Sequence, residues 1–475
     1  MAMLHLQSID QHKRVVRCTQ PPGVAYMLLL VRGRDLFRLV MTYQMGKARI
    51  VLLISIIAGV SILGFLIYVR GFESVFDLWN INSRHTPWLD LRLITQSSYS
   101  YAQGYDPAIQ NPGDPLHRVF NYPKIWYLLF AAGINDAWTW PLAVAMVSLF
   151  FAAVVFFPGR LSSVTTLLLL LSLASPAVML GVARANVDLL IFIAMAGSLL
   201  LAPESPIAAL GILLIAILLK LFPVLGSGLF MTRERSGSLK FLLGPVAFTA
   251  IYFLASLHDM LLVTGNSQTG IERTYGIGVL PAFAKQAAHS VALGKSLPWL
   301  YASMSLANRV FTAHPFLPVA IATALCSAAI FLGSRYRDQL DTVDPRNFRA
   351  FWMGAPIYVG SFFFGTNWEY RLIFALFCLP QLVDWATLVE RWRKWIAILT
   401  LCMLFVSLWQ TLFVPSINSI IPFGSYFLLL FDQAATWTLL TTLVWLLASS
   451  MPGWLFQDMV SLLRKAAHTT PAAER

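Results

Sequence analysis

Long apolar runs follow one another along most of this chain and limit what it can fold into. Of the 475 residues, 58% are hydrophobic and only 12% are charged, whereas soluble globular proteins carry about 25% charged residues. The mean hydropathy is +0.69, so part of the apolar surface must face lipid. We therefore predict an all-α polytopic membrane protein with about 11–13 transmembrane helices, and not a soluble enzyme.

The order of apolar runs and basic segments predicts a topology. The first expected span, residues 50–69, follows Lys47 and Arg49, which predicts a cytoplasmic N-terminus. Further expected spans are residues 125–134, 138–157, 164–182, 187–201, 207–231, 241–263, 316–333, 351–364, 373–385, 395–414 and 423–447. Basic connections at 233–240, 335–349 and 391–394 then lie inside, and the long polar loops 70–124 and 264–297 lie outside. The net charge of +12 is explained by these topology signals and by anionic lipid, without nucleic acid as a partner.

Three regions follow from this pattern. Residues 1–48 form a basic cytoplasmic segment, residues 49–450 the membrane domain, and residues 451–475 an amphipathic cytoplasmic tail. If each apolar run crosses the membrane once, Arg160 lies outside and Arg184 lies inside. The runs between residues 125 and 205 are short, so re-entrant segments remain an alternative there.

The first long loop contains the carboxylates that are candidates for chemistry. A carboxylate beside a membrane surface can act as a general base toward a hydroxyl group. Asp106 and Asp114 lie in Gly-Tyr-Asp-Pro and Asn-Pro-Gly-Asp-Pro, which are turn signals. Asp90 leads into a predicted helix and is either the base or a helix cap.

Ionisable residues inside or beside apolar runs form a second group of candidates, because charge within a membrane is costly. They are Arg184 and Asp188, Lys220, and Glu369 with Arg371. Arginine and lysine at the outer boundary can hold a phosphate group. The alternative is an interhelical ion pair or a side chain that reaches toward the headgroups.

Signatures of soluble catalysts are missing from the sequence. It contains no phosphate-binding loop, dinucleotide fingerprint, Gly-x-Ser-x-Gly or His-Glu-x-x-His motif. Its four cysteines lack metal-ligand spacing. We therefore expect no cofactor and no metal.

Five short motifs follow one another along the chain: an outer-loop Asp, Gly104-Tyr-Asp106-Pro107, Phe120-Asn-Tyr122-Pro123, Leu219-Lys220-Leu-Phe-Pro223 and Asn367-Trp-Glu-Tyr-Arg371. Taken in this order, they resemble the motifs of bacterial GT-C glycosyltransferases, and most closely those of glycosyltransferase family 87, which includes polyprenyl-phosphate-mannose-dependent mannosyltransferases. The resemblance covers residues 50–390. Two departures concern the sugar and the acceptor: Lys124 stands where the family often has a second Pro, and Arg184-Ala precedes Asn186 where Gly-Gln is common.

The resemblance implies a GT-C-like bundle whose extracytoplasmic loops carry short helices. It implies transfer of mannose or another hexose or pentose from a polyprenyl-phosphate donor to an envelope glycolipid or glycan, by inverting direct displacement at the outer face of the bacterial inner membrane. Asp90 would be the catalytic residue, with Asp77 as alternative. The expected substrate-binding residues are Asp106, Arg118, Tyr122, Arg184, Asn186, Lys220, Glu369 and Arg371.

Two other functions fit the same features. A transporter or flippase for lipid-linked saccharides would use the intramembrane charges and would need no base. A polymerase of lipid-linked saccharides would be expected to use a polyprenyl-diphosphate donor. A polyprenyl-phosphate sugar, an acceptor and membrane lipid are the partners that the favoured function requires.

Overall fold

A computed structural model describes residues 46–81, 86–231, 235–266, 273–292, 298–336, 344–387, 391–420, 424–458 and 461. The N-terminal segment expected at 1–48 lies outside these residues except for its last three. The C-terminal tail is described only for 451–458 and 461. Of the loop expected at 264–297, residues 267–272 and 293–297 are outside the description.

The described chain is helical apart from one short two-stranded pairing. Antiparallel β1 and β2 pair Thr274 with Trp368 and Tyr275 with Asn367. The elements in chain order are α3 (Lys47–Arg70), α4 (Phe72–Phe76), η1 (Asp77–Trp79), α5 (Leu89–Ala102), η2 (Lys124–Trp126), α6 (Tyr127–Ala131), η3 (Asp136–Trp138), α7 (Thr139–Phe156), α8 (Ser163–Leu173), α9 (Pro176–Arg184), α10 (Val187–Leu201), α11 (Pro206–Leu219), η4 (Phe222–Phe230), α12 (Arg235–Ala255), α13 (Leu257–Asn266), β1 (Thr274–Tyr275), α14 (Val279–Ala292), α15 (Pro298–Ala313), α16 (Leu317–Arg335), α17 (Pro345–Phe363), β2 (Asn367–Trp368), η5 (Glu369–Cys378), α18 (Leu379–Ala386), α19 (Arg391–Trp409), η6 (Gln410–Phe413), α20 (Val414–Ile420) and α21 (Gly424–Ser449).

Long apolar helices confirm an all-α polytopic membrane protein. Within the described residues, six helical segments are long and apolar enough to cross a membrane: Lys47–Arg70, Asp136–Phe156, Ser238–Ala255, Leu317–Arg335, Trp392–Ile420 and Tyr426–Ser449. A seventh span arises if α8 and α9, which meet at a bend of 55°, are counted together. The first of these helices, α3, presents Ile54, Ile57 and Phe65 at 57–65% exposure, as a lipid-facing helix does.

Several runs that were expected to span once are instead broken or short, which accounts for the smaller number of long helices. The run 125–134 contains the end of η2 and the five-residue α6. The run 207–231 breaks at Lys220, between α11 and η4, and the run 373–385 is divided between η5 and α18. A proline lies at the first or second position of α9, η4 and α18, which favours the start of a new helix at each of these places. Apolar composition alone does not reveal such breaks.

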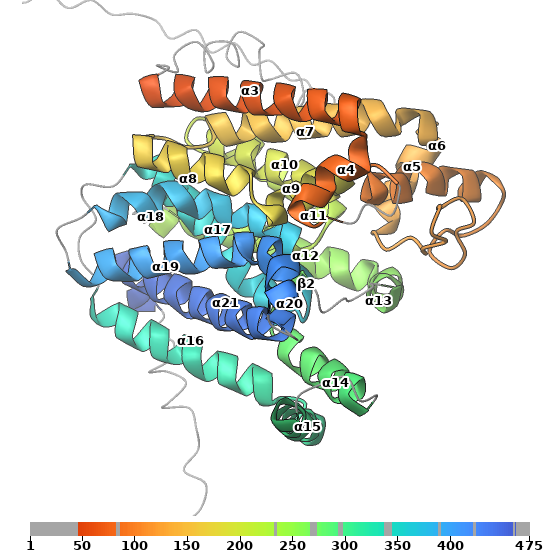
Figure 1. Cartoon of the computed structure of the whole chain (residues 1–475). Coiled ribbons are helices and arrows are strands. Elements are labelled where there is room, and N and C mark those ends of the chain that lie inside the picture. Colours follow the sequence, from red (N-terminus) through yellow and green to blue (C-terminus); the bar gives the residue numbers. More distant parts are fainter. Residues whose placement is uncertain are drawn as a thin grey trace, which may run out of the picture. The chain divides into compact units, whose positions relative to one another are not determined.

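Side-chain contacts define two ends of the membrane domain. At one end, the Arg49 side chain donates to the carbonyls of Pro158 and Gly159, and the Asn347 side chain bonds Gly159 N and Arg160 O. This basic end therefore contains the starts of α3, α8 and α17. We call the other end the loop end. There the backbone N–H of Trp88, just before α5, donates a hydrogen bond to Ala183 O in α9 over 3.2 Å. Figure 1 shows α5, α6, α13 and α14 together at one end of the long helices.

These contacts correct one part of the expected topology. Arg160 lies at the basic end and Arg184 at the loop end, the reverse of the assignment based on one crossing per run. The physical reason is α6, which is too short to cross, so every later run up to α11 traverses in the opposite direction. The bend between α8 and α9 fits either a broken span or the re-entrant segment named as the alternative for this region.

Close packing between α17 and η5 predicts a stability difference between two glycines. A Cβ on Gly354 would lie 2.6 Å from Phe374 O and 2.9 Å from Phe377 Cβ, whereas nothing lies within 4 Å of one on Gly64 in α3. Gly354→Ala should therefore destabilise the protein by about 1–3 kcal/mol, and Gly64→Ala should not. Thermal unfolding in detergent, followed by tryptophan fluorescence, measures both. Equal melting temperatures for the two variants would contradict this packing.

Candidate functional site

Asp90 lies at the start of α5, where the chain is anchored to α9. Trp88 is the N-cap of α5, has φ of 59° and makes no side-chain cap bond. Asp90 is therefore in the first helical turn and does not cap the helix, which removes that alternative. Its carboxylate lies near the positive end of the helix dipole. Trp88 and Ala185 (φ 43°) both adopt left-handed backbone conformations on either side of this contact, and such strain is common at functional sites.

Three side chains surround the Asp90 carboxylate. Asn186 Nδ2 donates to Oδ2 over 2.6 Å, Arg118 Nη1 lies 3.4 Å from Oδ1, and Arg184 Nη1 lies 3.9 Å from Oδ2. Asp90 is 7% exposed. Because a carboxylate offers about four lone-pair positions, these contacts leave room for one further donor, such as a hydroxyl group of a ligand.

Asp114 fixes Arg118 in this position. Its side chain is fully buried, and its Oδ1 accepts from the backbone N–H groups of Leu116 and Arg118, as the predicted turn requires. Its Oδ2 lies 2.8 Å from Arg118 Nη2. Arg118 also donates to Leu89 O over 2.6 Å, so the guanidinium ties the loop to the first turn of α5.

A second carboxylate, Asp188, lies beside the first. It is fully buried, and its Oδ1 is 2.5 Å from Lys220 Nζ while its Oδ2 is 3.4 Å from Arg371 Nε. Asn186 links the two carboxylates, because its Oδ1 accepts from Asp188 N while its Nδ2 donates to Asp90. The sequence indicated Asp188 as an ionisable residue in an apolar run but did not give it a role.

Three of the cations each lie against an aromatic ring. Lys220 Nζ lies 5.3 Å from the ring centroid of Tyr122, Arg184 Cζ lies 4.8 Å from that of Trp368, and Arg371 Cζ lies 4.7 Å from that of Phe222. Such contacts hold cations in place without neutralising them. Burial, and then the negative charge of Asp90, hold the pKa of Tyr122 well above its usual value, so its hydroxyl keeps its proton as a hydrogen-bond donor.

The structure thus brings seven of the ten predicted residues together, and they define the site: Asp90, Arg118, Tyr122, Arg184, Asn186, Lys220 and Arg371. Among the described residues, its ion pairs join four cations to the carboxylates of Asp90, Asp114 and Asp188. One formal positive charge is left over. Because charge is expensive in a low-dielectric environment, the site favours an anionic ligand.

Two predicted carboxylates lie apart from the site. Asp77 is exposed at the start of η1. Asp106 accepts from Ala108 N, as its turn motif predicts, and from the Tyr127 hydroxyl, and it lies 3.6 Å from Lys124 Nζ. The contacts of Asp106 are those of a turn beside α6.

Glu369 also points away from the site, although it is two residues from Arg371. It is 2% exposed, and its Oε1 accepts from Gln410 Nε2 over 2.7 Å. Burial raises the pKa of Glu369 to about 7, against the opposing effects of the Arg273 charge and the Gln410 hydrogen bond. Its partners belong to the packing between η5 and η6.

Comparison with known proteins finds no match to a family model, to a curated protein or to a solved structure. Among the described residues, no group of three or more His, Cys, Asp or Glu side chains is arranged to hold a metal ion. The interpretation of the site therefore rests on its own geometry and charge.

The raised pKa of Glu369 predicts a pH-dependent stability. Below pH 4.5, its ordinary pKa, the side chain is protonated in both folded and unfolded chains. As the pH rises to about 7, the unfolded chain ionises first, so the free energy of unfolding falls, and above 7 the loss is constant. Glu369→Gln removes this titration. Its free energy of unfolding relative to that of the parent should therefore be about 3 kcal/mol higher at pH 8 than at pH 4.5.

Melting temperatures measured by fluorescence between pH 4.5 and 8 provide the test, with Glu204→Gln as a control at an exposed glutamate. The parent and Glu204→Gln should lose stability in parallel, while Glu369→Gln should lose less. Parallel curves for all three proteins would show that folding does not raise the pKa of Glu369.

Proposed function

We propose that this protein is a membrane glycosyltransferase that moves a sugar from a polyprenyl-phosphate donor to an envelope glycolipid or glycan. The observation that carries the proposal is a buried carboxylate, Asp90, placed within a site that holds one excess positive charge. A sugar ester of polyprenyl phosphate is a phosphodiester with a single negative charge, which balances that excess. Its lipid tail suits a site between apolar helices.

Each part of the site has a place in direct displacement. Lys220 and Arg371 would bind the donor phosphate, held apart from each other by Asp188. Asp90 would take the proton from the acceptor hydroxyl as its oxygen bonds to the anomeric carbon. The bond from that carbon to the phosphate oxygen breaks, and the electron pair leaves with the polyprenyl phosphate, whose charge the cations stabilise. Attack from the opposite side inverts the anomeric centre.

The difference in exposure between the two carboxylates supports these roles. Asp90 is partly reachable, whereas Asp188 is fully buried and saturated by two cations. A base must touch its substrate, so Asp90 is the better candidate, and Asp188 is a positioning residue for Lys220 and Arg371. The GT-C resemblance assigns the same role to Asp90. We place the site at the extracytoplasmic face of a bacterial inner membrane, because it lies at the loop end, opposite to the basic connections.

A transporter or flippase for lipid-linked saccharides is the main alternative. It would use the same cations to bind the headgroup, but it would not need a carboxylate with a free lone-pair position. The two functions therefore differ in their dependence on Asp90.

Replacement of Asp90 by Asn tests the base. Transfer of radiolabelled sugar from polyprenyl phosphate in proteoliposomes should fall by a hundredfold or more, in line with the range of about 10²–10⁴ for general-base catalysis. Binding of the lipid should persist, because the cations remain. Asp77→Asn is the matched control and should retain transfer. Activity that survives in both variants would exclude Asp90 and Asp77 as the base.

Donor competition separates the transferase from a polymerase. Polyprenyl monophosphate, with about 1.5 to 2 negative charges, exceeds the excess positive charge of the site by less than polyprenyl diphosphate does. It should therefore compete with the donor more strongly than the diphosphate. Inhibition of transfer by the two lipids measures this preference. Stronger inhibition by the diphosphate would favour a polymerase.

A further inference from the structure

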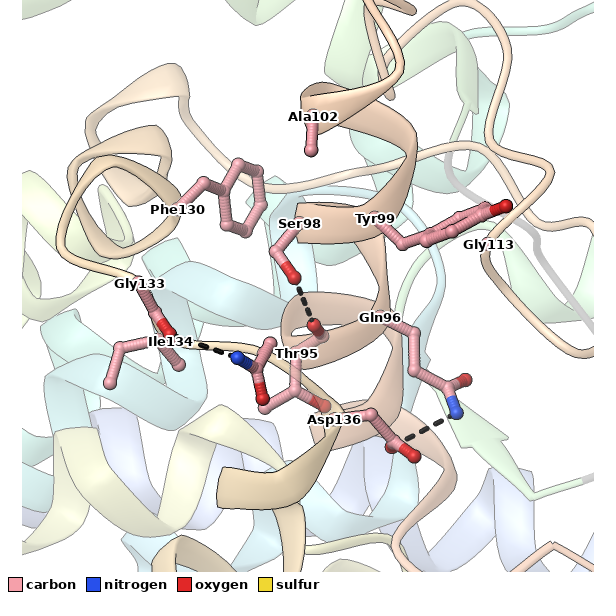
Figure 2. Close-up of a pocket in the computed structure, with 11 residues that line it drawn as sticks. Thr95, Gln96, Ser98, Tyr99, Ala102, Gly113, Phe130, Gly133, Ile134 and Asp136 are labelled. Atoms are coloured by element: carbon pink, nitrogen blue, oxygen red, sulfur yellow. Dashed lines mark hydrogen bonds between the residues drawn. The ribbon is translucent and has the colours of Figure 1, made fainter.

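A pocket of about 550 Å³ lies on α5, away from the site that contains Asp90. Its volume is in the range of small-molecule binding sites. Tyr99, which lines it, is nine residues after Asp90 and so lies about half a turn around the helix from it. Figure 2 shows Ser98 and Ala102 between the rings of Phe130 and Tyr99, with Gln96 and Asp136 at the lower side of the view. The same helix therefore presents the candidate base on one face and this pocket on the other.

Hydrogen bonds on both sides fix the walls of the pocket. The hydroxyl groups of Thr95 and Thr139 lie 2.6 Å apart. Asp136 Oδ1 accepts from Gln96 Nε2 and from Arg92 Nη1, each over 3.0 Å. These contacts join α5 to the start of α7, so the pocket is formed without a ligand.

The lining chemistry limits the ligand. None of the described lining residues is Lys, Arg or His, and the carboxylate of Asp136 is 56% exposed, so an anion such as a lipid phosphate is disfavoured. Hydroxyl, amide and carboxylate groups disfavour a purely apolar ligand. Tyr99 is 60% exposed and offers a ring face, while Ser98 adds a hydroxyl group to the lining. A ligand with many hydroxyl groups and apolar C–H faces satisfies all of these groups.

We infer that this pocket binds a neutral saccharide. The bound sugar ring belongs to the acceptor, but it is not the ring that carries the reacting hydroxyl. The assignment to the acceptor rests on the proposed function, whereas the binding of saccharide does not. From the rise of α5, the pocket lies on the order of 10 Å or more from Asp90, which is further than one sugar ring extends. An acceptor that reaches both the pocket and Asp90 must therefore extend around α5, so it is an oligosaccharide and not a single sugar.

Binding to a printed array of neutral oligosaccharides tests the pocket directly, with the full chain in lipid nanodiscs as the probe. The parent protein should bind a subset of the glycans. Tyr99→Ala should lower the affinity for that subset about tenfold through the loss of a stacking face. Tyr105→Ala removes an exposed tyrosine of the same loop that does not line the pocket, and it should bind as the parent does. Melting temperatures equal to the parent's would establish that both variants are folded.

The outcomes separate this inference from the proposed function. Glycan binding without sugar transfer would support the pocket and count against the transferase. Failure of the parent to bind any glycan, or equal losses in Tyr99→Ala and Tyr105→Ala, would overturn the inference, even if transfer activity is found.

Discussion

The pairing of buried carboxylates with cations at the ends of apolar helices is the interaction on which the site depends. Asp90 and Asp188 are almost completely buried, and an unpaired charge there would cost several kcal/mol. Arg118, Arg184, Lys220 and Arg371 offset that cost, while Asn186 joins the two pairs. With the carboxylate of Asp114 included, the four cations exceed the three carboxylates by one, so the arrangement is fully balanced only when an anion is bound.

This arrangement requires helices that stop short of a full crossing. Asn186 caps α10 directly after α9 ends, Lys220 follows the end of α11, and Arg371 lies in the irregular turns of η5. A continuous helix would place such side chains along its length, with its backbone groups already satisfied. Broken helices instead bring polar ends from distant parts of the chain to one point. Irregular backbone is tolerated at membrane depth where protein surrounds it, and η5 is buried along most of its length.

The sequence predicted the class of fold because apolar composition and basic flanks are properties of whole segments. It also indicated most of the site, since ionisable residues next to apolar runs are few and conspicuous. It did not predict the direction of crossing around Arg160 and Arg184, which depends on whether the short run 125–134 spans. Glu369 and Asp106 were grouped with the site by proximity in sequence or by motif, yet their side chains turn toward Gln410 and Tyr127. Asp188 became prominent only through its tertiary contacts with Lys220 and Arg371. No local pattern encodes such contacts between helices far apart in sequence.

The most direct test measures the affinity of the full chain in nanodiscs for two lipids, polyprenyl phosphate and polyprenol. Polyprenol has the same tail but no charge. If the excess positive charge binds the headgroup, the phosphate should bind at least about tenfold more tightly than the alcohol. Lys220→Met should remove most of that difference while binding of the alcohol stays the same. Equal affinities of the parent protein for the two lipids would contradict an anion site at Asp188, Lys220 and Arg371, and with it the proposed donor.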